Sequence, residues 1–177
     1  MDEQSIIELK DVSFQYQDGE EFSLSEINLK IEKGDFIGII GNSGAGKTSL
    51  TQVLSGVIPH HYRGDFYGMA LVKGQDTLSL KPDELSQTIG SVFQDIDAQM
   101  VATIVEDELL FGLENFGVPR DEIEERLLEA MKLTGIEALR YRSIATLSGG
   151  QKQKVAIASI IALRPEILVL DEPTGEL

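Results

Sequence analysis

The feature that most constrains this chain is an eight-residue stretch, Gly41-Asn42-Ser43-Gly44-Ala45-Gly46-Lys47-Thr48. It fits the pattern G-x-x-x-x-G-K-[ST], in which glycines let backbone N–H groups approach a phosphate chain closely. Residues 35–40 before it are predicted to form a short apolar strand, and residues 48–54 a helix start. Strand, glycine turn and helix are the context that this motif requires. The stretch predicts nucleotide binding rather than a glycine-rich turn that matches by accident.

The side chains at the end of this loop have the chemistry of a phosphate site. Lys47 is expected to reach the β- and γ-phosphates, and the Thr48 hydroxyl to bind Mg²⁺. The following helix adds partial positive charge at its N-terminus. Ser49, in the first turn of that helix, completes the candidate binding set.

A second candidate lies at the end of the apolar run 167–170, which is followed by Asp171 and Glu172. A continuous apolar run of this length is typical of a strand in a parallel sheet. Ligands bind at the carboxyl ends of such strands, where one carboxylate can hold Mg²⁺ and the next can polarise an attacking water. The alternative is two solvated acids at a strand end. The phosphate loop favours the functional interpretation.

The acidic composition argues against several classes of partner. The 177-residue chain has 30 acids and 15 bases, a net charge of −15. Nucleic acids and anionic membrane surfaces both need clustered Lys and Arg. No cysteine is present, which excludes disulfides and thiolate metal sites and fits a reducing cytosol. The apolar run 155–163 is too short to span a bilayer, so we expect no direct membrane insertion.

The remaining pattern predicts an α/β fold in which an antiparallel β layer precedes the nucleotide core. Residues 95–147 are predicted to be helical and to form an inserted subdomain, with a capping box at Thr103–Glu106. Ser148 is predicted to cap a buried helix that runs to Ile161. The other predicted elements are strands at 6–14, 22–31, 65–73 and 89–93, a loop at 56–64 and helices beginning at Pro82 and Pro119.

The stretch Leu147-Ser148-Gly149-Gly150-Gln151 distinguishes a general nucleotide-binding protein from a member of one specific family. Alone it is a loop with a helix cap. Together with the other motifs, it resembles the signature of the nucleotide-binding domain of ATP-binding-cassette (ABC) proteins. The Walker A motif of that family matches residues 41–48, and the Walker B motif matches residues 167–171. The family's glutamine loop matches Gln94, and its adenine-stacking aromatic matches Tyr16. The resemblance covers nearly the whole chain.

The resemblance implies ATP and Mg²⁺ as cofactors and a role for each matched residue. The Walker A residues hold the phosphates, and Glu172 is the general base. Thr48, Gln94 and Asp171 serve Mg²⁺ and its waters. Tyr16 stacks on adenine, with a surface tyrosine as the alternative. The signature residues act in trans, which implies a second ABC ATPase domain in a homodimer, a heterodimer or the same chain. They are Ser148, Gly149, Gly150 and Gln151.

A narrower resemblance points to the ATPases of energy-coupling-factor importers. It is carried by residues 93–99, 103–108 and 111–119. Residues 58–64 resemble the variant with two ATPase domains in one chain, which is linked to thiamine or its pyrimidine precursor. This implies uptake of a vitamin or metal ion, through a transmembrane subunit, at the cytoplasmic face of the membrane. The adjacent histidines at 60 and 61 are interpreted as a loop feature rather than a metal site.

The end of the sequence departs from the family pattern. Residues 174–177 begin the family's D-loop, but its aspartate and the later switch histidine do not follow. We therefore expect an incomplete ABC domain with parts at 1–94, 95–147 and 148–177, and poor stability and activity for these residues alone. Two alternatives remain: a soluble ABC ATPase of DNA repair or translation, and a non-catalytic nucleotide-binding fragment.

Overall fold

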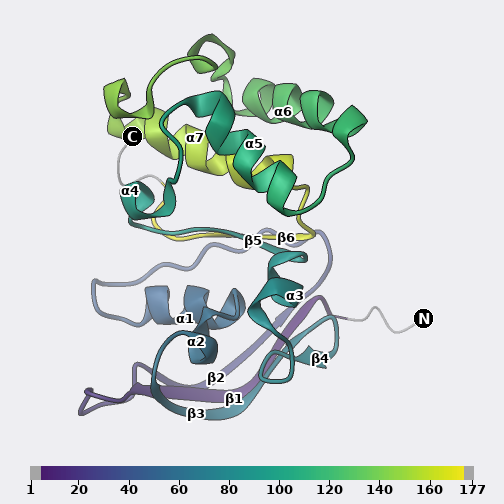
Figure 1. The fold of residues 1–177 in the computed structure, drawn as a ribbon. Helices are drawn as coiled ribbons and strands as arrows, with labels where there is room; N and C mark the ends of the chain where they lie inside the picture. The colour runs from purple at the N-terminus through teal and green to yellow at the C-terminus, as the bar shows by residue number, and fades with distance from the viewer. Residues whose placement is uncertain (1–4, 174–177) are drawn as a thin grey trace. The chain divides into compact units, whose positions relative to one another are not determined.

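The computed structural model describes residues 5–173, which form two compact units (Figure 1). The first unit is Met1–Ser86 and the second is Gln87–Leu177. The first carries the phosphate-loop motif, and the second carries the signature and Walker B motifs. Within the described residues, no helix combines the length and apolar character needed to cross a bilayer.

The first unit is built on an antiparallel sheet with strand order β2-β1-β3-β4. This confirms the predicted β layer, in which the long strands pair through β1. The phosphate-loop residues lie between β2 and β3 in the chain. The strands are β1 (Ile7–Tyr16), β2 (Leu24–Ile31), β3 (Gly64–Val72) and β4 (Gln75–Asp76).

A bulge in β1 explains the mixed alternation of its sequence. Ile7 and Leu9 are buried, and after the irregularity the buried positions become Val12 and Phe14. The register shifts between Leu9 and Val12 against β2 and between Lys10 and Ser13 against β3, and Asp11 has a positive φ of 48° there. One extra residue moves the alternation from odd to even positions. Both halves of β1 therefore bury their apolar side chains.

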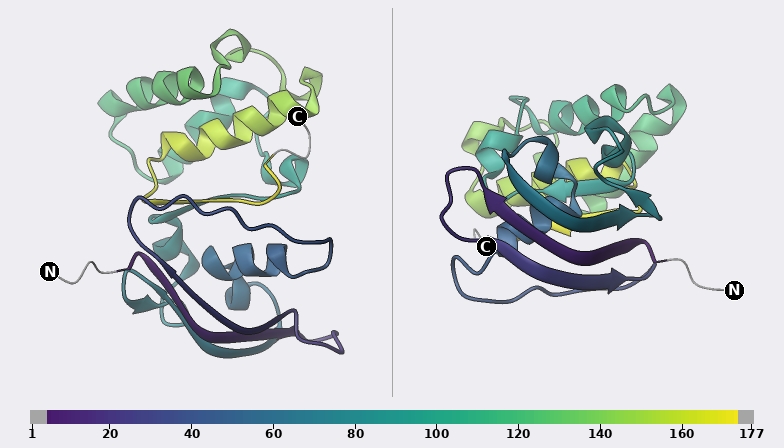
Figure 2. Two further views of the ribbon diagram at one scale, coloured as in Figure 1. Left: turned by 180° about the vertical axis from the view of Figure 1, so that it is seen from behind. Right: turned by 90° about the horizontal axis from the view of Figure 1, so that it is seen from below.

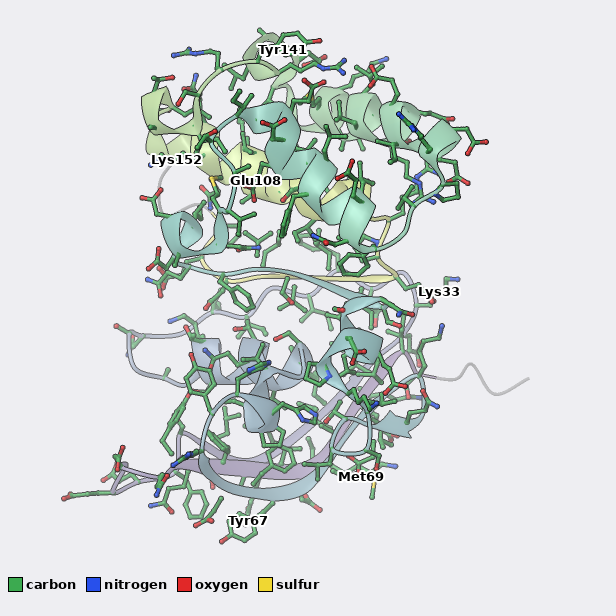
Figure 3. All side chains as sticks on the ribbon, in the orientation of Figure 1. Lys33, Tyr67, Met69, Glu108, Tyr141 and Lys152 are labelled. Carbon is green, nitrogen blue, oxygen red and sulfur yellow. The ribbon has the colours of Figure 1, made fainter. Side chains whose placement is uncertain are left out.

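Short helices cover one face of this sheet (Figures 1 and 2). α1 (Lys47–Leu54) follows the phosphate loop, as predicted, and α3 spans Pro82–Ser86. α2 (Val57–His60) is a helical turn inside the segment predicted to be a loop. On the other face, Tyr67 and Met69 project outward with 54% and 42% of their surfaces exposed (Figure 3).

The predicted strand at residues 35–40 is not formed, which corrects the expected strand–turn–helix context. These residues have no regular secondary structure, and Phe36 and Ile40 are 100% and 95% exposed. A strand needs a hydrogen-bonded neighbour. None of the strands in residues 5–173 pairs with this segment. The apolar sequence of residues 35–40 is therefore not sufficient to make them a strand.

The second unit contains both strands predicted there, β5 (Ile89–Val92) and β6 (Ile167–Leu170), and they pair in parallel. The pairing is in register from Ile89 opposite Ile167 to Val92 opposite Leu170. α7 (Gly149–Ala162) packs against β5 at Gly90, where a Cβ would lie 2.4 Å from the Ile160 side chain. Glycine is needed there because helix and strand approach so closely.

The other helices of the second unit stack with α7 on one side of the strand pair (Figures 1 and 2). Leu109, Leu127, Met131 and Val155 are fully buried where they meet. In the segment predicted to be helical, the regular elements are helices and 3₁₀ turns, joined by irregular stretches and one bridge between Ile104 and Ser143. Its elements are α4 (Ile96–Gln99), α5 (Val105–Asn115), α6 (Arg120–Thr134) and the 3₁₀ turns Glu137–Leu139 and Ile144–Thr146.

The predicted capping box at Thr103 is wrong. α5 begins at Val105 with Ile104 as its N-cap, and no side chain caps it. Instead, the Val105 and Glu106 amides donate to the carbonyls of Arg142 and Arg140. These tertiary partners satisfy the first N–H groups, so the helix needs no side-chain cap.

Arg140 connects α5 and α6 through two carboxylates. Its guanidinium donates to Glu106 at 2.8 Å and to both oxygens of Glu124 at 2.9 and 3.0 Å. The hydrogen bonds from Arg140 hold the pKa of Glu124 below its ordinary value, and the two carboxylates raise the pKa of Arg140. Because its folded-state pKa is depressed, Glu124 adds stability that is present above its unfolded-state pKa and is lost as pH falls through the folded-state value.

Replacing Arg140→Gln should therefore destabilise the full-length protein most at neutral pH. The loss in free energy of unfolding should shrink as pH falls below about 4, where carboxylates become protonated. Denaturant titrations over a pH series measure the loss, and NMR titration should show the pKa of Glu124 rising in the variant. Arg120→Gln, at an exposed position on α6, is the control. An unchanged Glu124 pKa would contradict the assignment.

Candidate nucleotide site

The phosphate loop leads into α1 through a glycine in the left-handed region. Gly46 is the N-cap, with φ of 84°, and no side chain caps the helix. The first N–H groups of α1 therefore have no side-chain acceptor, and such groups bind anions. Lys47 folds back along the loop, and its Nζ donates to the carbonyls of Gly41 at 3.1 Å and Asn42 at 3.0 Å. The Lys47 ammonium and the uncapped N–H groups of α1 thus lie within one helical turn of each other in the chain.

Tyr16 is tied to α1 by its hydroxyl. It lies 3.1 Å from Ser49 Oγ and donates to Gln52 Oε1 at 3.0 Å. The buried Ser49 is also 3.1 Å from Ser23 Oγ, so it joins β1, the start of β2 and α1. A depression of about 310 Å³ adjoins the tyrosine, a volume in the range of ligand pockets. It is lined by Gln15, Tyr16, Gln17, Gly64 and Asp65.

In the second unit, Gln94 and Glu172 meet although they are 78 residues apart in the chain. The Gln94 carboxamide donates to Glu172 Oε2 at 3.1 Å. Each lies two residues past the end of its strand, β5 or β6, and the Asp171 amide continues the ladder by donating to the Val92 carbonyl at 2.9 Å. Asp171 is 7% exposed, while both Gln94 and Glu172 are exposed. A carboxamide and two carboxylates therefore share the carboxyl end of a parallel strand pair.

This donor set fits a magnesium ion, which prefers carboxylate, carbonyl and water oxygens. In the hydrogen-bond pattern of residues 5–173, the carboxylate oxygens of Asp171 accept no hydrogen bond, so they remain available to a cation. The described residues contain no group of three or more His, Cys, Asp or Glu side chains with metal-binding geometry. Mg²⁺ does not need such a cage, because one or two carboxylates and substrate phosphates commonly hold it.

The predicted cap of α7 is present as a full capping box. Ser148 Oγ accepts from the Gln151 amide at 3.3 Å, and Gln151 Oε1 accepts from the Ser148 amide at 3.0 Å. Because the hydroxyl of Ser148 acts as an acceptor inside this box, its proton stays free to donate to a ligand. Gly149 and Gly150 form the first helical positions and add no side chain in front of the helix end.

The structure brings Gln153, which the sequence did not indicate, to the backbone of Glu172. Gln153, on α7, is 2% exposed and donates to the backbone carbonyl of Glu172 at 3.3 Å. Its Oε1 is buried and accepts no hydrogen bond from the described residues. A glutamine in an amphipathic helix carries no sequence signal for this role. Gln153 supports the backbone at which Glu172 takes its positive φ of 48°.

Comparison with known proteins identifies the family of this chain. The sequence model described as "ABC transporter" matches residues 24–175. A putative ABC transporter ATP-binding protein of Pyrococcus horikoshii is 46% identical over 173 residues, 98% of this chain and 61% of the relative. The chain belongs to the ABC transporter ATP-binding family.

Another curated member of the ABC family is longer still relative to this chain. A putative ATP-binding protein of Caldanaerobacter subterraneus is 46% identical over 96% of this chain, which spans only 30% of it. The chain thus covers less than two thirds of these curated relatives.

Solved ABC structures support the fold. The structure of cbiO1 from Clostridium perfringens, described as part of the ABC transporter complex cbiONQ, is 35% identical. It superposes with a TM-score of 0.84 over 99% of this chain and 68% of that one. The dimeric cassette MJ0796, bound to ADP and Pi, is 30% identical and has a TM-score of 0.82 over 97% of this chain and 75% of that one.

Each expected site residue falls into one of two groups. Tyr16, Ser49 and the Walker A residues lie together in the first unit. Gln94, Asp171 and Glu172 lie together in the second, which also carries the signature helix. The residue roles expected from the ABC resemblance are taken up as proposals below.

Proposed function

We propose that this chain is the ATP-binding and ATP-hydrolysing part of an ABC importer. The observation that carries the proposal is the 3.1 Å contact between the Gln94 carboxamide and the Glu172 carboxylate at the ends of paired strands. The pair lies at the carboxyl ends of parallel strands, where ligands bind in α/β sheets. This pair and Asp171 are the proposed catalytic residues of the second unit, and the phosphate loop is the proposed ATP-binding segment of the first.

Binding of ATP is assigned to the first unit. The uncapped start of α1 and the Lys47 ammonium bind the phosphates. Tyr16 borders a depression of about 310 Å³, and its ring would stack on the adenine. With its hydroxyl held by α1, the ring is fixed before the nucleotide arrives. Because the ring is already fixed, we favour adenine stacking over the alternative that Tyr16 is an ordinary surface tyrosine.

Hydrolysis is assigned to the strand-end residues. Glu172 takes a proton from the attacking water, and Gln94 orients the carboxylate that does so. Asp171, with Gln94 and the Thr48 hydroxyl, would hold Mg²⁺, which neutralises charge on the phosphate oxygens when bound. The Gln153 contact keeps the Glu172 backbone in place during the proton transfer.

We infer that the signature helix completes the ATP site of a second cassette. The free proton of the Ser148 hydroxyl and the start of α7 suit a γ-phosphate presented from outside the chain. The dimeric cassettes among the solved relatives support such pairing. The second cassette belongs to another copy, a related subunit or the same polypeptide. ATP binding would join the two cassettes, and hydrolysis would release them.

We place this ATPase at the cytoplasmic face of a membrane, bound to a transmembrane subunit. The likeness to cbiO1, part of the complex cbiONQ, supports this placement and an energy-coupling-factor type of importer. The cargo class is a small nutrient, either a vitamin or a metal ion. A net charge of −15 gives no support to nucleic acid as the partner.

In the full-length protein, Glu172→Gln should keep ATP binding and lose turnover. The amide cannot accept the proton of the attacking water, so kcat should fall by at least roughly 100-fold. Steady-state hydrolysis and binding of a fluorescent ATP analogue measure the two properties. Glu137→Gln, at an exposed position, is the matched control. A Glu172→Gln variant with wild-type kcat would refute the base assignment, and a wild-type protein that binds ATP without turnover would favour a non-catalytic module.

The membrane role predicts how the full-length protein distributes in extracts of its native cells. It should sediment with the membrane fraction and leave it in mild detergent together with a hydrophobic subunit. Ultracentrifugation followed by affinity purification and mass spectrometry measures this. Recovery of the protein in the soluble fraction without such a subunit would favour a soluble cassette of DNA repair or translation.

A further inference from the structure

The side chain of Gln99 bridges two backbone groups at the end of β5. Its Oε1 accepts from the Phe93 amide at 3.0 Å, and its Nε2 donates to the Ser91 carbonyl at 3.0 Å. The orientation of the carboxamide is fixed, because a backbone amide can only donate and a carbonyl can only accept. Gln99 is the last residue of α4 and is half-buried.

These contacts close a strand edge that would otherwise be open. In a strand, alternate residues direct their backbone groups to the same edge. Val92 uses one edge to bind β6, where its carbonyl accepts from Asp171. Ser91 and Phe93 face the other edge, and none of the strands in residues 5–173 pairs there. The Gln99 carboxamide supplies one acceptor and one donor, as a neighbouring strand would.

The short helix that carries Gln99 is held in place independently. Asp95 caps α4 by accepting from the Ala98 amide at 3.0 Å. Asp97 accepts from Lys152 Nζ at 2.7 Å, which ties α4 to the signature helix. Because α4 is fixed at its start and against α7, Gln99 does not move with the end of β5 and can hold that end in place.

Gln94 directly follows the amide that Gln99 holds. The Gln94 side chain is exposed and donates to Glu172. We propose that Gln99 is a positioning residue that fixes the backbone at Phe93 and so aims Gln94 at Glu172. This inference rests on the proposed hydrolytic function and adds a residue that lies outside the expected site.

The test compares Gln99→Ala with wild type in the full-length protein. We expect kcat for ATP hydrolysis to fall by roughly 10-fold, as for the loss of other residues that orient a catalytic group. KM for ATP should stay unchanged, because the polar contacts of Gln99 are to Ser91 and Phe93. Gln87→Ala, an exposed position before β5, is the matched control and should retain wild-type kcat.

Gln99→Glu gives a signature that loss of folding cannot produce. Its carboxylate can accept from the Phe93 amide but faces the Ser91 carbonyl without a proton. Protonation restores the donor, and a glutamate has a pKa of about 4.3 when unperturbed. The kcat of this variant relative to wild type should therefore rise as pH is lowered, whereas the ratio for Gln99→Ala should stay flat.

Hydrogen exchange measures the contact between Gln99 and the Phe93 amide itself, independently of turnover. The Phe93 amide should exchange faster in Gln99→Ala than in wild type, while amides in α5 keep their rates. Wild-type kcat in Gln99→Ala, or an unchanged Phe93 exchange rate, would overturn the inference and leave the hydrolytic function standing. A wild-type protein without turnover would instead overturn the hydrolytic function, and the positioning role with it.

Discussion

The parallel pairing of β5 with β6 is the constraint on which the candidate catalytic site depends. The register from Ile89–Ile167 to Val92–Leu170 brings together two chain segments that the whole helical insertion separates. It leaves Gln94 and Glu172 side by side. The close approach of α7 at Gly90 fixes the helix above these strands, and Gln153 on the same helix holds the Glu172 backbone. One pairing therefore positions the base, its amide partner and the signature helix.

Much of this arrangement could be predicted because it depends on local chemistry. The Ser148–Gln151 capping box forms from residues three apart, and its sequence is sufficient to start α7. The β6 strand follows from four consecutive apolar residues that end at two acids. The loop before α1 needs a left-handed residue, which Gly46 supplies. In each case, the residues that make the interaction are close in the sequence.

The features that could not be predicted depend on partners far away in the chain. Residues 35–40 have the composition of a strand, but no strand among residues 5–173 pairs with them. Thr103 lies at the expected capping position, yet α5 takes its acceptors from the backbone near Arg140. Gln99 and Gln153 are ordinary polar residues in sequence. They become supports of the site only when the strand ends are in place.

The central claim, that Gln94 and Glu172 act as one unit, is tested most directly by a double-mutant cycle. Single-turnover rates of ATP hydrolysis would be measured for Gln94→Ala, Glu172→Gln and the double variant of the full-length protein. Residues that act as a unit give non-additive losses. We predict that the double variant is slower than Glu172→Gln by no more than roughly twofold. Losses that multiply across the cycle would contradict the claim.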